Sequence, residues 1–188
     1  MRRAVAQAFL RATGWQAEGP RPASRRFVLI AAPHTSNWDL AYLLALAAVY
    51  DVSVSWMGKD SLFHGPGGAV LRRVGGIPVD RTHRGNLVRQ MAGLFEQRDR
   101  LALVVPAEGT RGYTAHWRSG FYHIARTANV PVVLGYLDYQ RKCGGFGPEL
   151  VLTGDVGQDM DEIRGFYSDK VGKHPQNFGP VRLKEEML

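Results

Sequence analysis

The chain has 188 residues, of which 45% are hydrophobic and 22% charged, a composition that fits one globular domain with a single core. Its net charge of +7 favours anionic partners, namely nucleic acid, anionic lipid or a phosphorylated substrate, without choosing among them. No apolar run reaches the roughly 20 residues of a membrane-spanning helix, and no secretory signal is recognised. The single cysteine, Cys143, excludes an internal disulfide framework and suits a reducing compartment. We therefore expect one domain over residues 1–188 in a cytoplasmic protein.

The first predicted elements are a terminal helix and a buried strand. Apolar residues recur at helical spacing over residues 1–13, with arginines between them. Such a basic amphipathic helix either contacts a membrane surface or packs on the domain, and both interpretations stay open. The apolar run over residues 26–32 predicts a strand that ends at Pro33, and an apolar helix is expected from Leu40.

Strands and helices continue to alternate along the rest of the chain. The pattern predicts strands over 51–57, 77–80, 101–105, 130–138 and 149–153, helices over 69–73, 87–95, 119–128 and 159–167, and a glycine turn over 144–147. This alternation predicts an α/β domain, a single layered unit with a mixed, mostly parallel sheet flanked by helices. His34, Arg81 and Glu108 lie in segments that each follow a predicted strand. We therefore expect these segments at one edge of the sheet, where such folds carry their sites.

His34 and Asp39 are five positions apart in the segment HTSNWD. On one regular helix their side chains would point roughly 140° apart and could not meet. They can meet if His34 precedes the helix and Asp39 lies in its first turn, and the residues between them are good helix caps. A carboxylate beside an imidazole fixes its tautomer, so the pair could act as a general base on a hydroxyl. By itself this spacing is more often structural.

A second polar cluster, Glu108-Gly109-Thr110-Arg111, leaves a predicted buried strand abruptly. Gly109 lets the backbone approach a ligand closely, and Arg111 offers a planar fork that suits phosphate. The alternative is a solvated loop with an ion pair between Glu108 and Arg111. Arg81 closes the segment GIPVDR, where it either binds an anion or pairs with a carboxylate.

Together and in this order, the segments HTSNWD, GIPVDR and EGTR, followed by Val130-Pro131-Val132-Val133, resemble the four blocks of the glycerophospholipid acyltransferase family. The best known members of this family are the 1-acyl-glycerol-3-phosphate acyltransferases. Arg118, within Trp117-Arg118-Ser119-Gly120-Phe121, matches the basic residue of the family's linking segment. One departure is Ala107, which separates Pro106 from Glu108 where the family places proline next to the glutamate.

The resemblance implies an O-acyltransferase in which His34 is the general base and Asp39 orients it. Arg81, Arg118 and the loop of Glu108, Gly109, Thr110 and Arg111 would bind a lysophospholipid acceptor through its phosphate. The acyl donor would be a thioester of coenzyme A or acyl carrier protein, with no metal and no further cofactor. We also expect peripheral contact with the cytoplasmic face of an anionic membrane and no nucleic-acid partner.

Three other interpretations use the same residues. The arginines could bind a carboxylate, so a lysolipid acceptor without phosphate is one variant. Water in place of the alcohol would make the enzyme a thioester hydrolase. A non-catalytic domain for anionic lipid or nucleic acid is the third, although only Trp117-Arg118 and Tyr139-Gln140-Arg141 place aromatic beside basic side chains.

Overall fold

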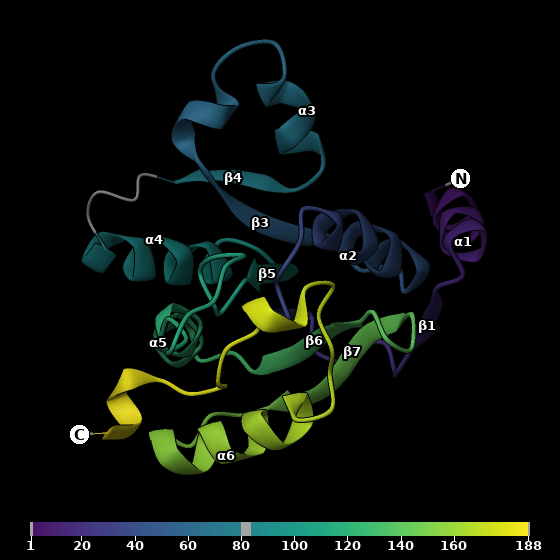
Figure 1. Ribbon diagram of the computed structural model, residues 1–188. Helices are drawn as coiled ribbons and strands as arrows, with labels where there is room; N and C mark the ends of the chain where they lie inside the picture. Colours follow the sequence, from purple (N-terminus) through teal and green to yellow (C-terminus); the bar gives the residue numbers. More distant parts are fainter. Residues whose placement is uncertain (1, 80–83, 188) are drawn as a thin grey trace.

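A seven-stranded sheet forms the centre of the residues that this computed structural model describes, 2–79 and 84–187 (Figure 1). The strands lie in the order β1-β7-β6-β2-β5-β3-β4. Neighbours are parallel from β6 to β4, whereas β7 is antiparallel to β6 and pairs in parallel with β1. The bounds are β1 Gln16–Glu18, β2 Arg26–Ala32, β3 Val54–Lys59, β4 Gly76–Val79, β5 Leu101–Val105, β6 Val132–Asp138 and β7 Cys143–Leu150. The sheet is thus mixed and mostly parallel, as the sequence predicts.

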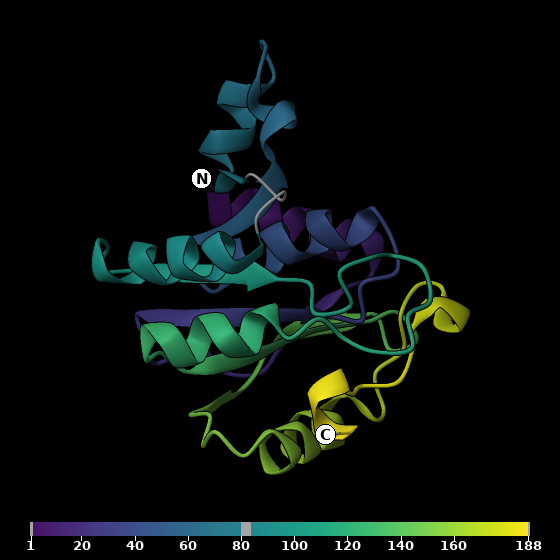
Figure 2. The same ribbon diagram turned by 90° about the vertical axis from the view of Figure 1, so that its left-hand side faces the viewer.

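Helices cover both faces of this sheet (Figures 1 and 2). They are α1 Arg2–Thr13, α2 Trp38–Val49, α3 Gly68–Arg73, α4 Arg84–Glu96, α5 Gly120–Ala128 and α6 Val156–Tyr167, with short 3-10 turns η1 Asp60–Phe63, η2 Pro175–Asn177 and η3 Lys184–Met187. Phe27 and Leu29 of β2 pack in a cluster with Ala47 of α2. Val28 and Ile30 belong to the larger cluster on the other face, to which α4, α5 and α6 contribute. Successive strand residues point to opposite faces, so the unbroken apolar run of β2 fills both layers.

The terminal helix α1 packs its apolar side on the domain. Ala6 and Leu10 are buried in a cluster with Trp15 and with Tyr42 of α2. The structure therefore supports the packed interpretation for these side chains, and membrane contact by residues 1–13 stays a prediction. None of the helices in the described residues is long and apolar enough to cross a membrane.

The glycine-rich segment after Cys143 is strand and not the predicted turn. It forms most of β7, which lies between β1 and β6. A Cβ atom at Gly145 would lie 1.9 Å from the carbonyl oxygen of Glu18, and one at Gly144 would lie 2.7 Å from that of Tyr136. Glycine is therefore needed here because neighbouring strands approach closely, a reason that a sequence pattern for turns does not capture.

The carboxyl ends of the parallel strands meet at one edge of the sheet. The turn after β2 carries His34, the loop after β5 carries Glu108, and β6 ends just before Tyr139. This confirms that the His34 and Glu108 segments come together. Arg81 follows β4 but lies outside the described residues.

Candidate active site

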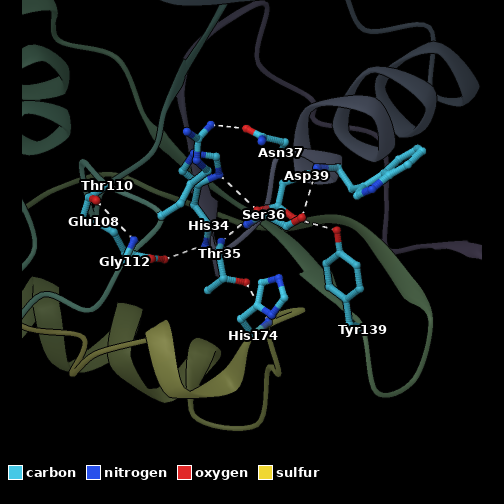
Figure 3. A network of polar contacts seen from close by, with 12 residues as sticks. His34, Thr35, Ser36, Asn37, Asp39, Glu108, Thr110, Gly112, Tyr139 and His174 are labelled. Carbon is cyan, nitrogen blue, oxygen red and sulfur yellow. Dashed lines mark hydrogen bonds and ion pairs between the residues drawn. The ribbon is translucent and has the colours of Figure 1, made fainter.

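The turn between β2 and α2 brings His34 to Asp39. The turn begins at Pro33, and α2 begins at Trp38, so His34 precedes the helix and Asp39 lies in its first turn. The Nδ1 atom of His34 is 3.2 Å from Oδ2 of Asp39 (Figure 3). A carboxylate is only an acceptor, so in the neutral ring this contact requires the proton on Nδ1 and leaves Nε2 with its lone pair. Because His34 and Asp39 are five positions apart, they can meet only in this arrangement, which is the one predicted for a general base.

Asp39 is the centre of a hydrogen-bond network and is only 4% exposed. Its Oδ2 atom also accepts from the backbone N–H groups of Thr35 and Ser36, each at 2.9 Å. The hydroxyl of Tyr139 donates to Oδ1 at 2.6 Å. Burial acts to raise the pKa of Asp39, but hydrogen bonds from His34, Tyr139 and the Ser36 N–H outweigh it, and the pKa is lowered. The carboxylate is thus held charged and in a fixed orientation.

Glu108 supports the same turn from below the surface. Its Oε1 atom accepts a 2.7 Å hydrogen bond from the backbone N–H of His34, and the residue is 1% exposed. The other oxygen, Oε2, is buried without a hydrogen-bond partner in the described part of the chain. Burial raises the pKa of Glu108 to about 7, partly offset by the bond from His34. Glu108 therefore positions the backbone that carries the histidine.

The loop after Glu108 lies against the helix start. Gly109 has a φ of 71°, and a Cβ atom there would lie 2.9 Å from Cγ of Arg118, so glycine is required on both grounds. The guanidinium of Arg111 donates to the side-chain oxygen of Asn37. Thr110 accepts from the N–H of Gly112 at 3.2 Å. This loop therefore fixes an exposed cation close to the His34 turn.

A cavity of about 590 Å³ opens between α2 and the sheet beside this pair. Its polar lining includes His34, Asp39 and Arg111, and Gly109 and Thr110 lie beside them. Its apolar lining comes from α2, β3, β5, β7 and the turn after β3, with Leu40, Leu43, Leu46, Trp56, Met57, Leu62, Val104 and Phe146. One side of the cavity can therefore take charge and the other a hydrocarbon chain.

A second, more open cavity of about 530 Å³ lies across the turn from the first. Arg111, Ser36 and Asn37 line both cavities, and Lys173 and His174 of the C-terminal segment line only the second. That segment is held to the turn by a 3.2 Å bond from the N–H of His174 to Oγ1 of Thr35.

Comparison with known proteins decides the family. The acyltransferase family profile matches residues 16–134, well over half of the chain. The chain belongs to the acyltransferase family. The crystal structure of the 1-acyl-sn-glycerophosphate (LPA) acyltransferase PlsC from Thermotoga maritima has a similar fold, with a TM-score of 0.61 at 14% sequence identity over 89% of this chain and 75% of that chain. No curated protein matches the sequence.

Only some of the predicted substrate-binding residues line a cavity in this acyltransferase. Gly109, Thr110 and Arg111 line the main cavity, as expected for substrate contacts. Glu108 and Arg118 are not among the residues that line either described cavity. Arg118 is exposed, and its backbone N–H donates to the carbonyl oxygen of Ala107 at 2.7 Å. Neither residue therefore has a surface in these cavities through which it could contact a substrate directly. The substrate-binding roles of Glu108 and Arg118 stay predictions.

Two residues of the candidate site were not predicted from the sequence. Tyr139 stood out only as an aromatic neighbour of Arg141, although its place after β6 puts it at the active edge. Asn37 stood out only as a helix cap, yet its side chain makes no capping bond and holds Arg111. Cys143 is buried, and burial raises its pKa to about 11, which favours the protonated thiol over the reactive thiolate.

Proposed function

We propose that this acyltransferase moves a fatty acyl group from a thioester to the hydroxyl of a lysophospholipid such as 1-acyl-glycerol-3-phosphate. One observation carries the proposal: the His34–Asp39 pair and the Arg111 cation line the same cavity as a set of apolar side chains. An amphipathic acceptor needs both kinds of surface. The similarity in fold to a 1-acyl-sn-glycerophosphate acyltransferase supports this choice of acceptor.

The proposed reaction forms no acyl-enzyme intermediate. Nε2 of His34 takes the proton of the acceptor hydroxyl while the hydroxyl oxygen attacks the thioester carbonyl carbon. The carbon–sulfur bond then breaks, and the leaving thiolate takes the proton back from the imidazolium, which regenerates neutral His34. Asp39 stabilises the imidazolium through its contact with Nδ1. No metal is used in this sequence of steps.

The acceptor phosphate is proposed to bind at Arg111. Its guanidinium is exposed, lines the cavity and is oriented by Asn37. Among the described residues, no carboxylate forms an ion pair with Arg111, so its charge is available to an anion. Arg81, which lies outside the described residues, remains a proposed second contact to the phosphate.

The apolar part of the cavity is proposed to hold the acyl chain. Leu43 and Leu46 project from α2 toward the sheet, and Phe146 of β7 lines the same cavity. Burial of methylene groups between these walls would favour binding by about 0.8 kcal/mol for each group. The chain would then extend away from His34, with its thioester carbon beside the ring. Both coenzyme A and acyl carrier protein thioesters satisfy this geometry.

A panel of acceptors and donors tests the proposal. Purified protein is incubated with acyl-coenzyme A or acyl carrier protein thioesters and with lysophospholipids that differ in headgroup, and the products are identified by mass spectrometry. Formation of a diacyl phospholipid supports the proposal, and a preference for phosphate-bearing acceptors supports the role of Arg111. Release of free fatty acid alone, with every acceptor, would show a thioester hydrolase instead.

We also propose that the protein works peripherally at the cytoplasmic face of an anionic membrane. Its lipid acceptor would reside there, and the net charge of +7 favours an anionic surface. Ala6 and Leu10 of α1 are already buried in the domain. Most of the contact would therefore come from another surface.

A further inference from the structure

The segment between β3 and β4 forms an arm that stands away from the sheet. This arm, residues 59–75, contains η1 and α3 and projects above β3 and β4 in both views (Figures 1 and 2). Phe63 is its buried anchor, 5% exposed. A Cβ atom at Gly76 would lie 2.7 Å from the Phe63 ring, and the ring centroid is 6.0 Å from that of Trp56. The arm is therefore a packed platform with a defined attachment to the sheet edge.

Apolar side chains on the arm face water. Leu62 is 55% exposed, Val70 is 61% exposed and Val74 is 39% exposed. Val70 and Val74 are four residues apart at α3 and its end, so they lie on the same side of that helix. Val70 and Val74 thus give the arm a small exposed apolar face, and Leu62 is exposed on the same projection.

The arm is also basic. Lys59, Arg72 and Arg73 are exposed, and none of them pairs with a carboxylate in the described part of the chain. The only acidic residue of the arm is Asp60, which contacts His64 at 2.7 Å. The guanidinium of Arg72 also lies over the Phe63 ring, 5.2 Å from its centroid, so it is held against the arm, whereas neither Lys59 nor Arg73 makes such a ring contact in the described part of the chain. Exposed apolar groups next to exposed cations are the combination that binds the headgroup region of an anionic bilayer.

The base of the arm is also a wall of the active-site cavity. Lys59 and Leu62 line this cavity together with His34. A lipid bilayer that touches the arm would therefore lie close to the apolar part of the cavity. A substrate chain could then move from the bilayer into the cavity with little exposure to water, which removes the cost of hydrating its methylene groups.

We infer that the arm, residues 59–75, docks the enzyme on an anionic lipid bilayer. Val70 and Val74 insert at the interface, Leu62 lies where the arm meets the cavity, and Arg73 faces the lipid headgroups. The passage of substrate from this surface rests on the proposed function, whereas the docking itself does not require turnover.

Vesicle flotation of the full chain tests the docking. Val70→Asp places a negative charge on the arm, and Val5→Asp and Val151→Asp place the same charge at positions that are 65% and 81% exposed elsewhere. With vesicles of mixed neutral and anionic phospholipid, we expect Val70→Asp to weaken binding by roughly five-fold or more. The two control variants should bind as the wild type does. Arg73→Gln should weaken binding to anionic vesicles and leave the weaker binding to neutral vesicles unchanged.

The outcomes separate the docking from the catalytic proposal. If the wild type floats, Val70→Asp does not, and no acyl transfer is found, the function fails and the docking surface stands. If Val70→Asp floats as the wild type does, or if only Val5→Asp fails to float, the inference is overturned. If Val70→Asp raises KM for an acyl carrier protein donor without changing flotation, the arm binds the donor protein and the inference is likewise overturned. Circular dichroism must show all variants folded.

Discussion

Nδ1 of His34 lies 3.2 Å from an Asp39 oxygen that also accepts the backbone N–H groups of Thr35 and Ser36. The two N–H groups belong to the turn that carries the histidine, so the carboxylate locks the turn and the ring together. Tyr139 fixes the other carboxylate oxygen. The orientation of the general base thus depends on one buried carboxylate with donors on both of its oxygens.

Asp39→Asn is expected to lower kcat by at least about a hundred-fold, since the amide neither stabilises the imidazolium nor fixes the tautomer. KM for both substrates should change little because the cavity walls remain. Steady-state kinetics measures both values. Asp159→Asn is a matched control, because Asp159 likewise accepts backbone N–H groups, from Thr153 and Gly154. Equal losses of activity in the two variants would show that Asp39 acts only through folding.

Tyr139→Phe is expected to lower kcat by roughly ten-fold, because a partly buried hydrogen bond to a charged group is lost. Tyr122→Phe provides the comparison, since its hydroxyl donates to Asp159 at 2.7 Å, away from the cavity. It should reduce thermal stability and leave kcat near the wild-type value. Full activity in Tyr139→Phe would show that the Tyr139 hydroxyl does not contribute to catalysis.

The raised pKa of Glu108 predicts that the unfolding free energy of the protein depends on pH. Its pKa is raised from 4.5 to about 7 in the folded protein, so folding favours the protonated form. This contribution is fully present below the unfolded pKa and is lost as the pH rises through about 7. Between about pH 5 and pH 8, the wild type should lose roughly 3 kcal/mol of unfolding free energy relative to Glu108→Gln.

Urea denaturation of both proteins across this pH range measures the difference. Glutamine keeps an acceptor for the His34 N–H but does not titrate, so groups other than Glu108 contribute equally to the two curves. Parallel stability curves would contradict the raised pKa of Glu108.

Arg111→Ala is expected to raise KM for a phosphate-bearing acceptor by about ten-fold, the loss of one charge-assisted contact. The KM for the thioester donor should be nearly unchanged. Arg118→Ala tests the other arginine that the sequence singles out, which is exposed and lies outside both described cavity linings. An unchanged acceptor KM in Arg111→Ala would place the phosphate elsewhere.

The sequence predicts the parts of this fold that depend on local patterns. The apolar runs of β2 and β5 predict two central strands at their observed bounds. The spacing of HTSNWD requires Asp39 in the first turn of α2, although the apolar run predicts a helix only from Leu40 and α2 begins at Trp38. Properties that depend on tertiary packing escape it. The glycines of β7 resemble a turn because their neighbours are not visible in sequence, and Glu108 looks like a surface loop residue although it is buried under His34.

Tyr139 escapes prediction for the same reason. It is separated from Asp39 by 100 residues, and only the parallel pairing of β6 with β2 brings the two together. Knowledge that β6 neighbours β2 would have placed Tyr139 beside the His34 turn. The order of the strands in the sheet is therefore the information that sequence patterns lack, and without it Tyr139 could not be assigned to the site.

The central claim is that Nε2 of His34 is the general base, and acyl transfer by His34→Ala tests it most directly. The variant removes the ring but not the N–H that Glu108 binds, so the turn should keep its fold by circular dichroism. Acyl transfer from thioester to lysophospholipid is followed by mass spectrometry. The account predicts that transfer falls by at least about a hundred-fold in a folded protein that still binds its substrates. Undiminished transfer by folded His34→Ala would contradict it.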